Sequence, residues 1–288
     1  MANTRIIKRR IKSAQNISQI TKAMEMVAAS KMKKAQEEAV MGKPYAQKIY
    51  EVTRQLAGKI NRESHPLLTL GNITGKKLIV LISTNKGLCG GLNTNLFRTV
   101  QKFVGTDKTY DFVAVGKKSQ NFIVRTGKNL TADFSATIPF TEIVPPLTQY
   151  LVQGFLNETY QEIYLVFNAF LSALRQIPVT KMILPISTLK TEDKVASDTD
   201  HFVEFLIEPS IDHVLDILLP HYLENQIRSS ILEAEASEHS ARMIAMKNAT
   251  DAAFELTQEL TLIYNKARQE KITNEIADIV TARLAVEV

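Results

Sequence analysis

Near both ends of the chain, apolar residues recur every three or four positions, the spacing of one face of an α-helix. Near the N-terminus this spacing joins Ile17, Ile20, Met24 and Val27. Near the C-terminus it joins Ala241, Ala245, Ala249, Ala252, Leu256, Leu260, Ile263 and Ala267, and continues through Ile272, Ile276 and Ile279. Each set forms one narrow stripe, typical of a coiled-coil seam, and positions such as Thr257 fall outside it. We therefore predict that two terminal helices pack on each other through these stripes.

The distribution of glycine and proline also predicts long helices at the two ends. All eleven glycines lie between Gly42 and Gly154, and all nine prolines lie between Pro44 and Pro220. In a helix interior, glycine costs about 1 kcal/mol and proline about 3 kcal/mol relative to alanine. Charge favours pairing of the two ends, because residues 1–40 carry nine Lys and Arg against three Glu, whereas residues 221–288 carry seven against eleven Asp and Glu.

The middle of the chain has a different pattern. Short apolar runs rich in Val, Ile and Phe alternate with helical patterns, which is typical of an α/β domain with a largely parallel sheet. The runs lie at 77–83, 111–116, 163–168, 181–186 and 202–207, and the helical patterns at 93–104, 117–126 and 147–160.

The predicted fold class is thus α/β, with a long antiparallel two-helix coiled coil formed by the N- and C-terminal helices and an inserted Rossmann-like α/β domain. The predicted divisions are a helix over 1–57, a globular domain over 75–208 and a second helix over 210–288.

Composition limits the classes of protein. The 288 residues are 45% hydrophobic and 23% charged, with a net charge of +5, which is ordinary for a chain with a buried core. The single cysteine, Cys89, rules out an intramolecular disulfide. The sequence has no apolar stretch of the length that spans a membrane. Its basic start lacks the apolar segment of a signal peptide, so we interpret it as mature sequence.

A glycine loop, TNKGLCGGLN at 84–93, follows the first predicted strand and precedes a predicted helix. Such a loop sometimes cradles a phosphate at the helix N-terminus. Its glycines fit neither the G-x-G-x-x-G nor the Walker A pattern, and GNITGKK at 71–77 lacks a spacer residue and the final Ser or Thr. The two interpretations are a nucleotide-dependent enzyme and a tight strand-to-helix turn, and the pattern favours the turn.

Other candidate chemistry is sparse. Cys89 is predicted to be a buried structural thiol rather than a nucleophile. The five histidines show no metal-ligand spacing, so we expect no metal site. The basic N-terminal segment is compatible with nucleic acid, a membrane surface or an acidic protein partner, although residues 1–44 contain no aromatic side chain for base stacking.

Several motifs resemble the gamma subunit of F-type ATP synthase. ITKAMEMVAASKMKKAQ at 20–36 resembles the N-terminal helix of that family, and STNKGLCGGLN at 83–93 resembles its glycine loop. ARMIAMKNATD at 241–251 and YNKARQEKITNEIADIV at 264–280 resemble its C-terminal helix. The chain departs from the family pattern at Asn85, where aspartate is common, and at Ala282 and Arg283, where Gly and Ala are usual.

The resemblance implies a non-catalytic central-stalk rotor subunit that transmits torque between a membrane c-ring and catalytic beta subunits, in ATP synthesis or hydrolysis coupled to ion flow. The implied partners are a surrounding hexamer of alpha and beta subunits, the epsilon subunit and the c-ring, with no nucleic acid and no cofactor. The implied location is the cytoplasmic side of a bacterial inner (plasma) membrane, reached peripherally through the complex.

Family positions carry over to particular residues of this sequence. The resemblance implies coupling contacts with beta subunits at Met24, Arg242, Arg268, Gln269, Thr273 and Glu275. It implies contacts with the c-ring and the epsilon subunit at Phe205 and Glu208.

Overall fold

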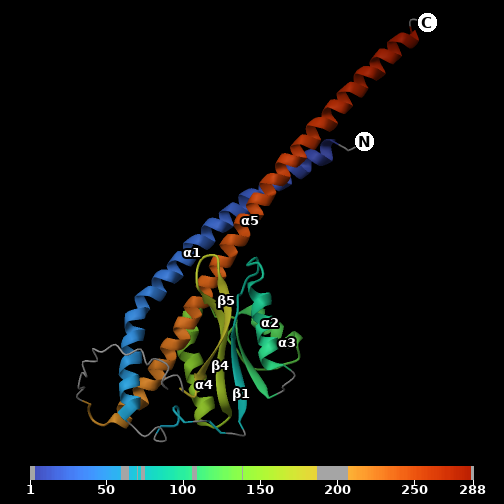
Figure 1. The fold of residues 1–288 in the computed structure, drawn as a ribbon. Coiled ribbons are helices and arrows are strands. Elements are labelled where there is room, and N and C mark those ends of the chain that lie inside the picture. Colours follow the sequence, from blue (N-terminus) through green and yellow to red (C-terminus); the bar gives the residue numbers. More distant parts are fainter. Residues whose placement is uncertain are drawn as a thin grey trace. The chain divides into compact units, whose positions relative to one another are not determined.

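A computed structural model describes residues 4–59, 65–69, 71–72, 75–105, 109–137, 139–186 and 207–286 (Figure 1). The chain forms two compact units. The first joins the residues up to Ala29 with those from Arg242 onward, and the second contains Ser30–Ala241. The predicted ranges 1–57, 75–208 and 210–288 divide the chain by sequence pattern, whereas these units group residues that pack together. The predicted division stays a prediction.

The predicted long terminal helices are present. Helix α1 is Thr4–Lys59 and helix α5 is Ile211–Val286. They run antiparallel to each other within the first unit (Figure 1). Helix α1 continues through Gly42 and Pro44, and α5 continues through Pro220. Tertiary packing on both sides outweighs the low helix propensity of these residues. Ala35 and Ile49 are buried on either side of Gly42 and Pro44, and Leu219 and Leu223 are buried on either side of Pro220.

The second unit contains one five-stranded sheet with the strand order β3-β2-β1-β4-β5. The first four strands in this order are parallel to their neighbours, and β5 pairs antiparallel with β4 at the edge. The strands are β1 (Lys76–Ile82), β2 (Tyr110–Val115), β3 (Asn129–Asp133), β4 (Tyr160–Phe170) and β5 (Gln176–Leu184). The connecting helices are α2 (Leu92–Val104), α3 (Lys117–Arg125), the short 3₁₀ helix η2 (Phe140–Ile143) and α4 (Val144–Leu156).

Helices cover both faces of this sheet (Figure 1). Alternate residues of β1 point to opposite faces, so Ile79 packs with α2 and α3 while Val80 packs with α4 and with segments of α1 and α5. Both faces are therefore buried, which explains why the central strands read as continuous apolar runs rather than alternating ones. The arrangement confirms the predicted Rossmann-like domain.

Four of the predicted strands correspond to β1, β2, β4 and β5, and the three helical patterns correspond to α2, α3 and α4. Strand β3 was not predicted, because this short edge strand, NLTAD, has few apolar residues. The predicted strand at 202–207 lies, except for Ile207, outside the described residues.

Among the described residues, none of the helices has the length and apolar character needed to cross a membrane.

Candidate functional site: the coiled-coil surface and the crevice at the glycine loop

The seam of the coiled coil in the first unit consists mainly of small and polar side chains. Buried and half-buried positions follow steps of four and three along both helices. On α1 they are Ile7, Ile11, Ala14, Ser18, Thr21, Glu25 and Ala28. On α5 they are Met246, Thr250, Ala253, Thr257, Leu260, Tyr264 and Ala267. The hydroxyl oxygens of Thr21 and Thr250 are 2.7 Å apart, so the two series face each other directly.

This seam corrects the predicted one. The α1 residues predicted to form it, Ile17, Ile20, Met24 and Val27, are 38% to 60% exposed. On α5, Leu256 and Ile263 are exposed by 47% and 43%, whereas Thr257 is half-buried on the seam. On α1 the real seam lies one residue further along the chain, which is about 100° around the helix. On α5 it is displaced in the same way at most positions, whereas Leu260 and Ala267 of the predicted stripe do lie on the seam. Small residues bring the helices close together at the Thr21–Thr250 contact, and several of the larger apolar side chains remain outside.

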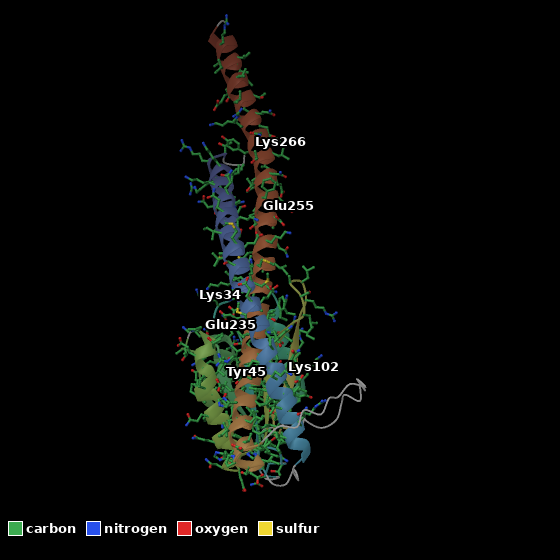
Figure 2. All side chains as sticks on the ribbon, turned by 90° about the vertical axis from the view of Figure 1, so that its left-hand side faces the viewer. Lys34, Tyr45, Lys102, Glu235, Glu255 and Lys266 are labelled. Atoms are coloured by element: carbon green, nitrogen blue, oxygen red, sulfur yellow. The ribbon has the colours of Figure 1, made fainter. Side chains whose placement is uncertain are left out.

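The coiled-coil surface therefore carries apolar side chains exposed to solvent. Besides the α1 stripe, it includes Phe254, Leu262, Ile272, Ile276, Ile279 and Val280 on α5, with exposures of 45% to 72%. Charged residues such as Glu255 and Lys266 project between them (Figure 2). An exposed apolar area that follows a helix over several turns is typical of an interaction surface.

The predicted coupling residues lie at two separate positions along the length of the coiled coil. Met24 lies about one turn from Thr21, and Arg242 lies about two turns from Thr250, so both lie on the same side of the Thr21–Thr250 contact. Met24 is 38% exposed and Arg242 is half-buried.

The other four predicted coupling residues form a separate group about 40 Å along α5 from Arg242 at 1.5 Å per residue. Arg268, Gln269, Thr273 and Glu275 are all exposed. The Thr273 hydroxyl donates to the backbone oxygen of Gln269 at 3.0 Å, and Glu275 pairs with Lys271 at 3.5 Å. The structure thus does not bring the six residues into one cluster.

Of the two predicted foot contacts, Glu208 is exposed and comes shortly before the start of α5. Phe205 lies outside the described residues.

The glycine loop folds back on itself. Asn93 donates to the Thr84 hydroxyl at 2.8 Å, and that hydroxyl donates to the Lys86 carbonyl at 2.7 Å. Cys89 is 3% exposed, as predicted for a structural thiol. Leu88 and Gly90 both have a positive φ, of 63° and 58°, so the tight turn needs the freedom that glycine supplies at one of these positions.

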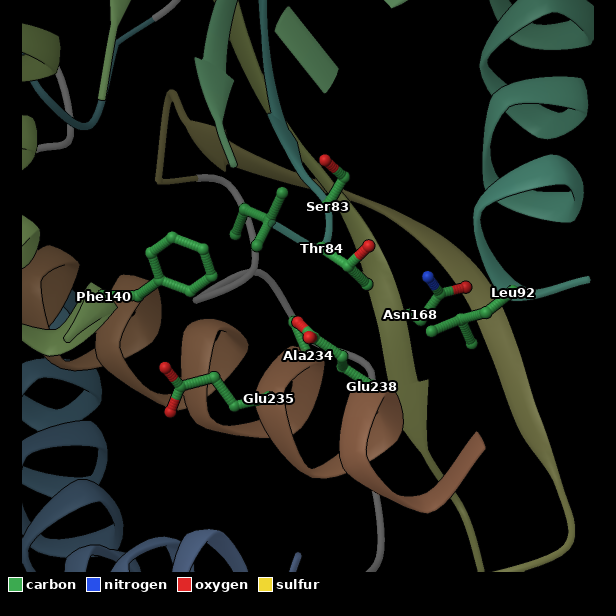
Figure 3. A pocket seen from close by; sticks show the side chains of 9 residues that line it. Ser83, Thr84, Leu92, Phe140, Asn168, Ala234, Glu235 and Glu238 are labelled. Carbon is green, nitrogen blue, oxygen red and sulfur yellow. The ribbon is translucent and has the colours of Figure 1, made fainter. Parts of the chain in front are cut away.

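The loop borders the point where the strand order reverses between β1 and β4, where ligands bind in many open α/β sheets. Here α5 fills the crevice (Figure 3). The remaining cavity has a volume of about 10 Å³, enough for about one water molecule. It is lined by Ile82, Ser83, Thr84, Leu92, Phe140, Asn168, Ala234, Glu235 and Glu238. The lining side chains include two carboxyl groups and no Lys or Arg to pair with a phosphate, so size and charge both disfavour a nucleotide here.

This geometry predicts that ATP and ADP leave the thermal unfolding of the purified chain unchanged. A nucleotide bound at 100 times its Kd would stabilise the folded chain by about 2.7 kcal/mol, which a melting curve detects easily. A clear rise in Tm with either nucleotide would contradict the assignment of the loop as a structural turn.

Sequence reasoning missed two features of this region. Asn85, which departs from the usual aspartate, accepts a hydrogen bond from the backbone N–H of Lys117 at 2.9 Å and so caps α3. Because the amide oxygen performs this task as a carboxylate would, the departure keeps the cap. The second feature is the pair Glu235 and Glu238, whose signal in the sequence is two carboxylates three positions apart beside the buried residues Ala236 and Ser237.

The electrostatics of this pair are unusual. Burial, and after it the neighbouring carboxylates of Glu238 and Glu38, raise the pKa of the Glu235 carboxyl group to about 7. The backbone N–H of Phe140 and the side chain of Lys31 act in the opposite direction.

The nearly filled crevice of the second unit and the exposed apolar side chains of the coiled coil are each typical of a protein that acts through contacts of its helical pair rather than through a bound ligand. Comparison with known proteins identifies the family. The family model described as ATP synthase matches residues 3–286. The ATP synthase gamma chain of Akkermansia muciniphila is 40% identical over 294 residues, covering 100% of both chains. That of Methylacidiphilum infernorum is 42% identical over 296 residues, covering 99% of this chain and 100% of the relative.

The chain therefore belongs to the ATP synthase gamma-chain family, and its role is that of a rotor subunit. A chain from the Euglena gracilis mitochondrial ATP synthase, in a structure of OSCP, F1 and the c-ring in rotational state 3, matches with a TM-score of 0.66 and 19% identity. The match covers 98% of this chain and 94% of that one. A chain of the rotor from the same organism matches with a TM-score of 0.60 and 19% identity, covering 93% and 98%. These likenesses show the fold.

Proposed function

We propose that this chain transmits torque between a membrane c-ring and the catalytic beta subunits, and that it carries no catalytic site of its own. The observation that supports this most strongly is the outward position of the large apolar residues on the coiled coil. Side chains such as Ile20 and Phe254, each 60% exposed, are stabilised when another protein removes them from water. A hexamer of alpha and beta subunits around the helices provides such an environment.

The coupling contacts proposed on this surface are the six residues Met24, Arg242, Arg268, Gln269, Thr273 and Glu275. A rotor changes the state of a beta subunit only if its contact energy differs between states. Contacts at two separate levels, with polar groups among apolar ones, supply such differences as the shaft turns. Phe205 and Glu208 are proposed as contacts with the c-ring and the epsilon subunit on the basis of the family motif.

We also propose the cytoplasmic side of a bacterial inner (plasma) membrane as the location, reached through the complex. The curated relatives described above are bacterial proteins. The alternative of a nucleotide-dependent enzyme receives no support from the crevice, where α5 leaves about 10 Å³.

The experiment that tests this function is affinity purification of the tagged full-length chain from native membranes after mild detergent extraction. We expect alpha, beta and epsilon subunits and the c-ring to co-purify. Replacing Ile20 and Val27, both exposed, with Asp should reduce recovery of alpha and beta without lowering the Tm of the purified chain, because neither side chain supports the seam. Recovery of the chain alone, or with nucleic acid, would contradict the proposed function.

A further inference from the structure

The hairpin formed by β4 and β5 is hydrogen-bonded to α5 near the end of the second unit (Figure 1). The Ser237 hydroxyl donates to the backbone oxygen of Asn168 on β4 at 2.9 Å. The Ser240 hydroxyl donates to the backbone oxygen of Ala173 in the turn at 2.6 Å. The side-chain amide of Gln176, which begins β5, donates to the Ser240 hydroxyl at 3.3 Å and to the Ala173 oxygen at 2.9 Å. We call Ser237, Ser240 and Gln176 the hairpin clamp, because together they bind both arms of the hairpin to one helix.

The two serines of the clamp are fully buried, and their bonds leave the helix. Ser237 and Ser240 are both 0% exposed. Serine hydroxyls inside helices often bond back to a carbonyl of the same helix, as Ser230 does to the Gln226 oxygen at 2.9 Å. Those of the clamp instead reach another element. Because they are shielded from water, losing one of these bonds leaves its partner unsatisfied.

The hairpin connects the clamp to the middle of the sheet. In its two paired strands, Phe170 of β4 lies opposite Gln176 of β5, and β4 pairs in turn with the central strand β1. Further along β5, the ammonium group of Lys181 donates to the side-chain oxygen of Gln226, so α5 is bonded to this edge strand at a second place. Hydrogen bonds therefore link the centre of the sheet to the helix.

Directional bonds restrict a helix in a way that apolar packing alone does not. Hydrophobic attraction is non-directional, whereas a hydrogen bond needs a defined distance and angle. We propose that Ser237, Ser240 and Gln176 are positioning residues that prevent α5 from rotating about its own axis within the second unit, so that sheet and helix turn as one body. Arg242, where α5 enters the first unit, follows Ser240 by only two residues. The inference rests on the proposed transmission of torque.

The first test is hydrogen exchange of the full-length chain and its Ser237→Ala/Ser240→Ala variant. The backbone N–H groups of Leu171 and Ser172 donate to the Arg175 oxygen within the turn, so their exchange reports opening of the turn. With two bonds to α5 removed, we expect these amides to exchange about tenfold faster than in the parent. Equal exchange in the two proteins would overturn the proposal.

The matched control is Ser230→Ala. It removes another buried hydroxyl from α5, but one that donates within the helix. The amides of the turn should therefore exchange as they do in the parent. A milder second variant is Gln176→Met, which keeps the length of the side chain and removes its donor group, and it should speed exchange in the same direction as the double variant.

The second test measures rotation in the intact complex, with the alpha–beta hexamer fixed to a surface and a bead attached to the c-ring. ATP-driven rotation of the parent tests the proposed function, and the angular fluctuations of the bead during pauses report the stiffness of the rotor. We expect larger angular variance in Ser237→Ala/Ser240→Ala and in Gln176→Met, and the variance of the parent in Ser230→Ala. Only assembled complexes are counted, so a general loss of stability does not produce this result.

The two proposals fail in different ways. If the parent complex rotates and the clamp variants show the same angular variance as the parent, the clamp does not carry the load and the inference is overturned. If the parent complex itself does not rotate, the proposed transmission of torque is overturned instead.

Discussion

Replacing Ala253 with Phe should destabilise the coiled coil, whereas the same change at the adjacent Ala252 should have little effect. Ala253 is 7% exposed and lies on the seam about one turn from the Thr21–Thr250 contact, while Ala252 is exposed. Overpacking a close interface costs about 1–3 kcal/mol. We expect Ala253→Phe to lower the free energy of unfolding by this amount, measured by circular dichroism of the purified chain in denaturant.

The matched pair makes the interpretation unambiguous, because both variants make the same chemical change one position apart on one helix. If Ala252→Phe proved as damaging as Ala253→Phe, the seam described here would be wrong. Thr257 is not a suitable outside control, although the apolar pattern alone suggests it, because the structure places Thr257 on the seam.

Replacing Met24 with Lys should lower the efficiency of coupling in the assembled complex. We propose, from the family resemblance, that Met24 meets an acidic loop of a beta subunit, and the side chain is 38% exposed on the coiled-coil surface. A new cation there would form a charge-assisted contact worth about 1.5–3 kcal/mol, which rotation must break at each passage. Ion pumping per ATP hydrolysed should therefore fall, while assembly and hydrolysis survive.

Met24→Leu is the control, because it keeps an apolar side chain of similar size and adds no charge. It should retain the coupling of the parent. Unchanged pumping per ATP in Met24→Lys would show that position 24 does not meet the acidic loop.

Much of the fold follows from the sequence because the relevant signals are local. The four longer strands are apolar runs, and the terminal helices lack glycine and proline over long distances. The position of the seam did not follow. A helix with a series at Ile17, Ile20 and Met24 has a neighbouring series at Ser18, Thr21 and Glu25, and the spacing of three and four is the same in both. The larger apolar side chains of Ile17, Ile20 and Met24 indicate the wrong series, because they lie on the outer surface of the coiled coil.

The proposed coupling residues show a second limit of sequence reasoning. Met24, Arg268 and Glu275 are proposed on the basis of family motifs, and on the chain by itself each is an exposed helical residue. The crevice was the reverse case. Three glycines near a strand end suggested a ligand site at the loop. The residues that occupy this site, Glu235 and Glu238, come from a helix almost 150 positions further along the chain, so nothing in the local sequence indicated them.

A seam built largely from Ala, Ser and Thr has a consequence for the amount of this protein that a cell makes. Because many large apolar side chains of the coiled coil face outward, the surface of a newly folded chain remains available for non-specific association until a partner covers it. We expect a surplus of the chain over the other subunits to self-associate or to be degraded. We therefore expect the cell to make this chain in balance with the other subunits, because the exposed surface makes a surplus prone to association.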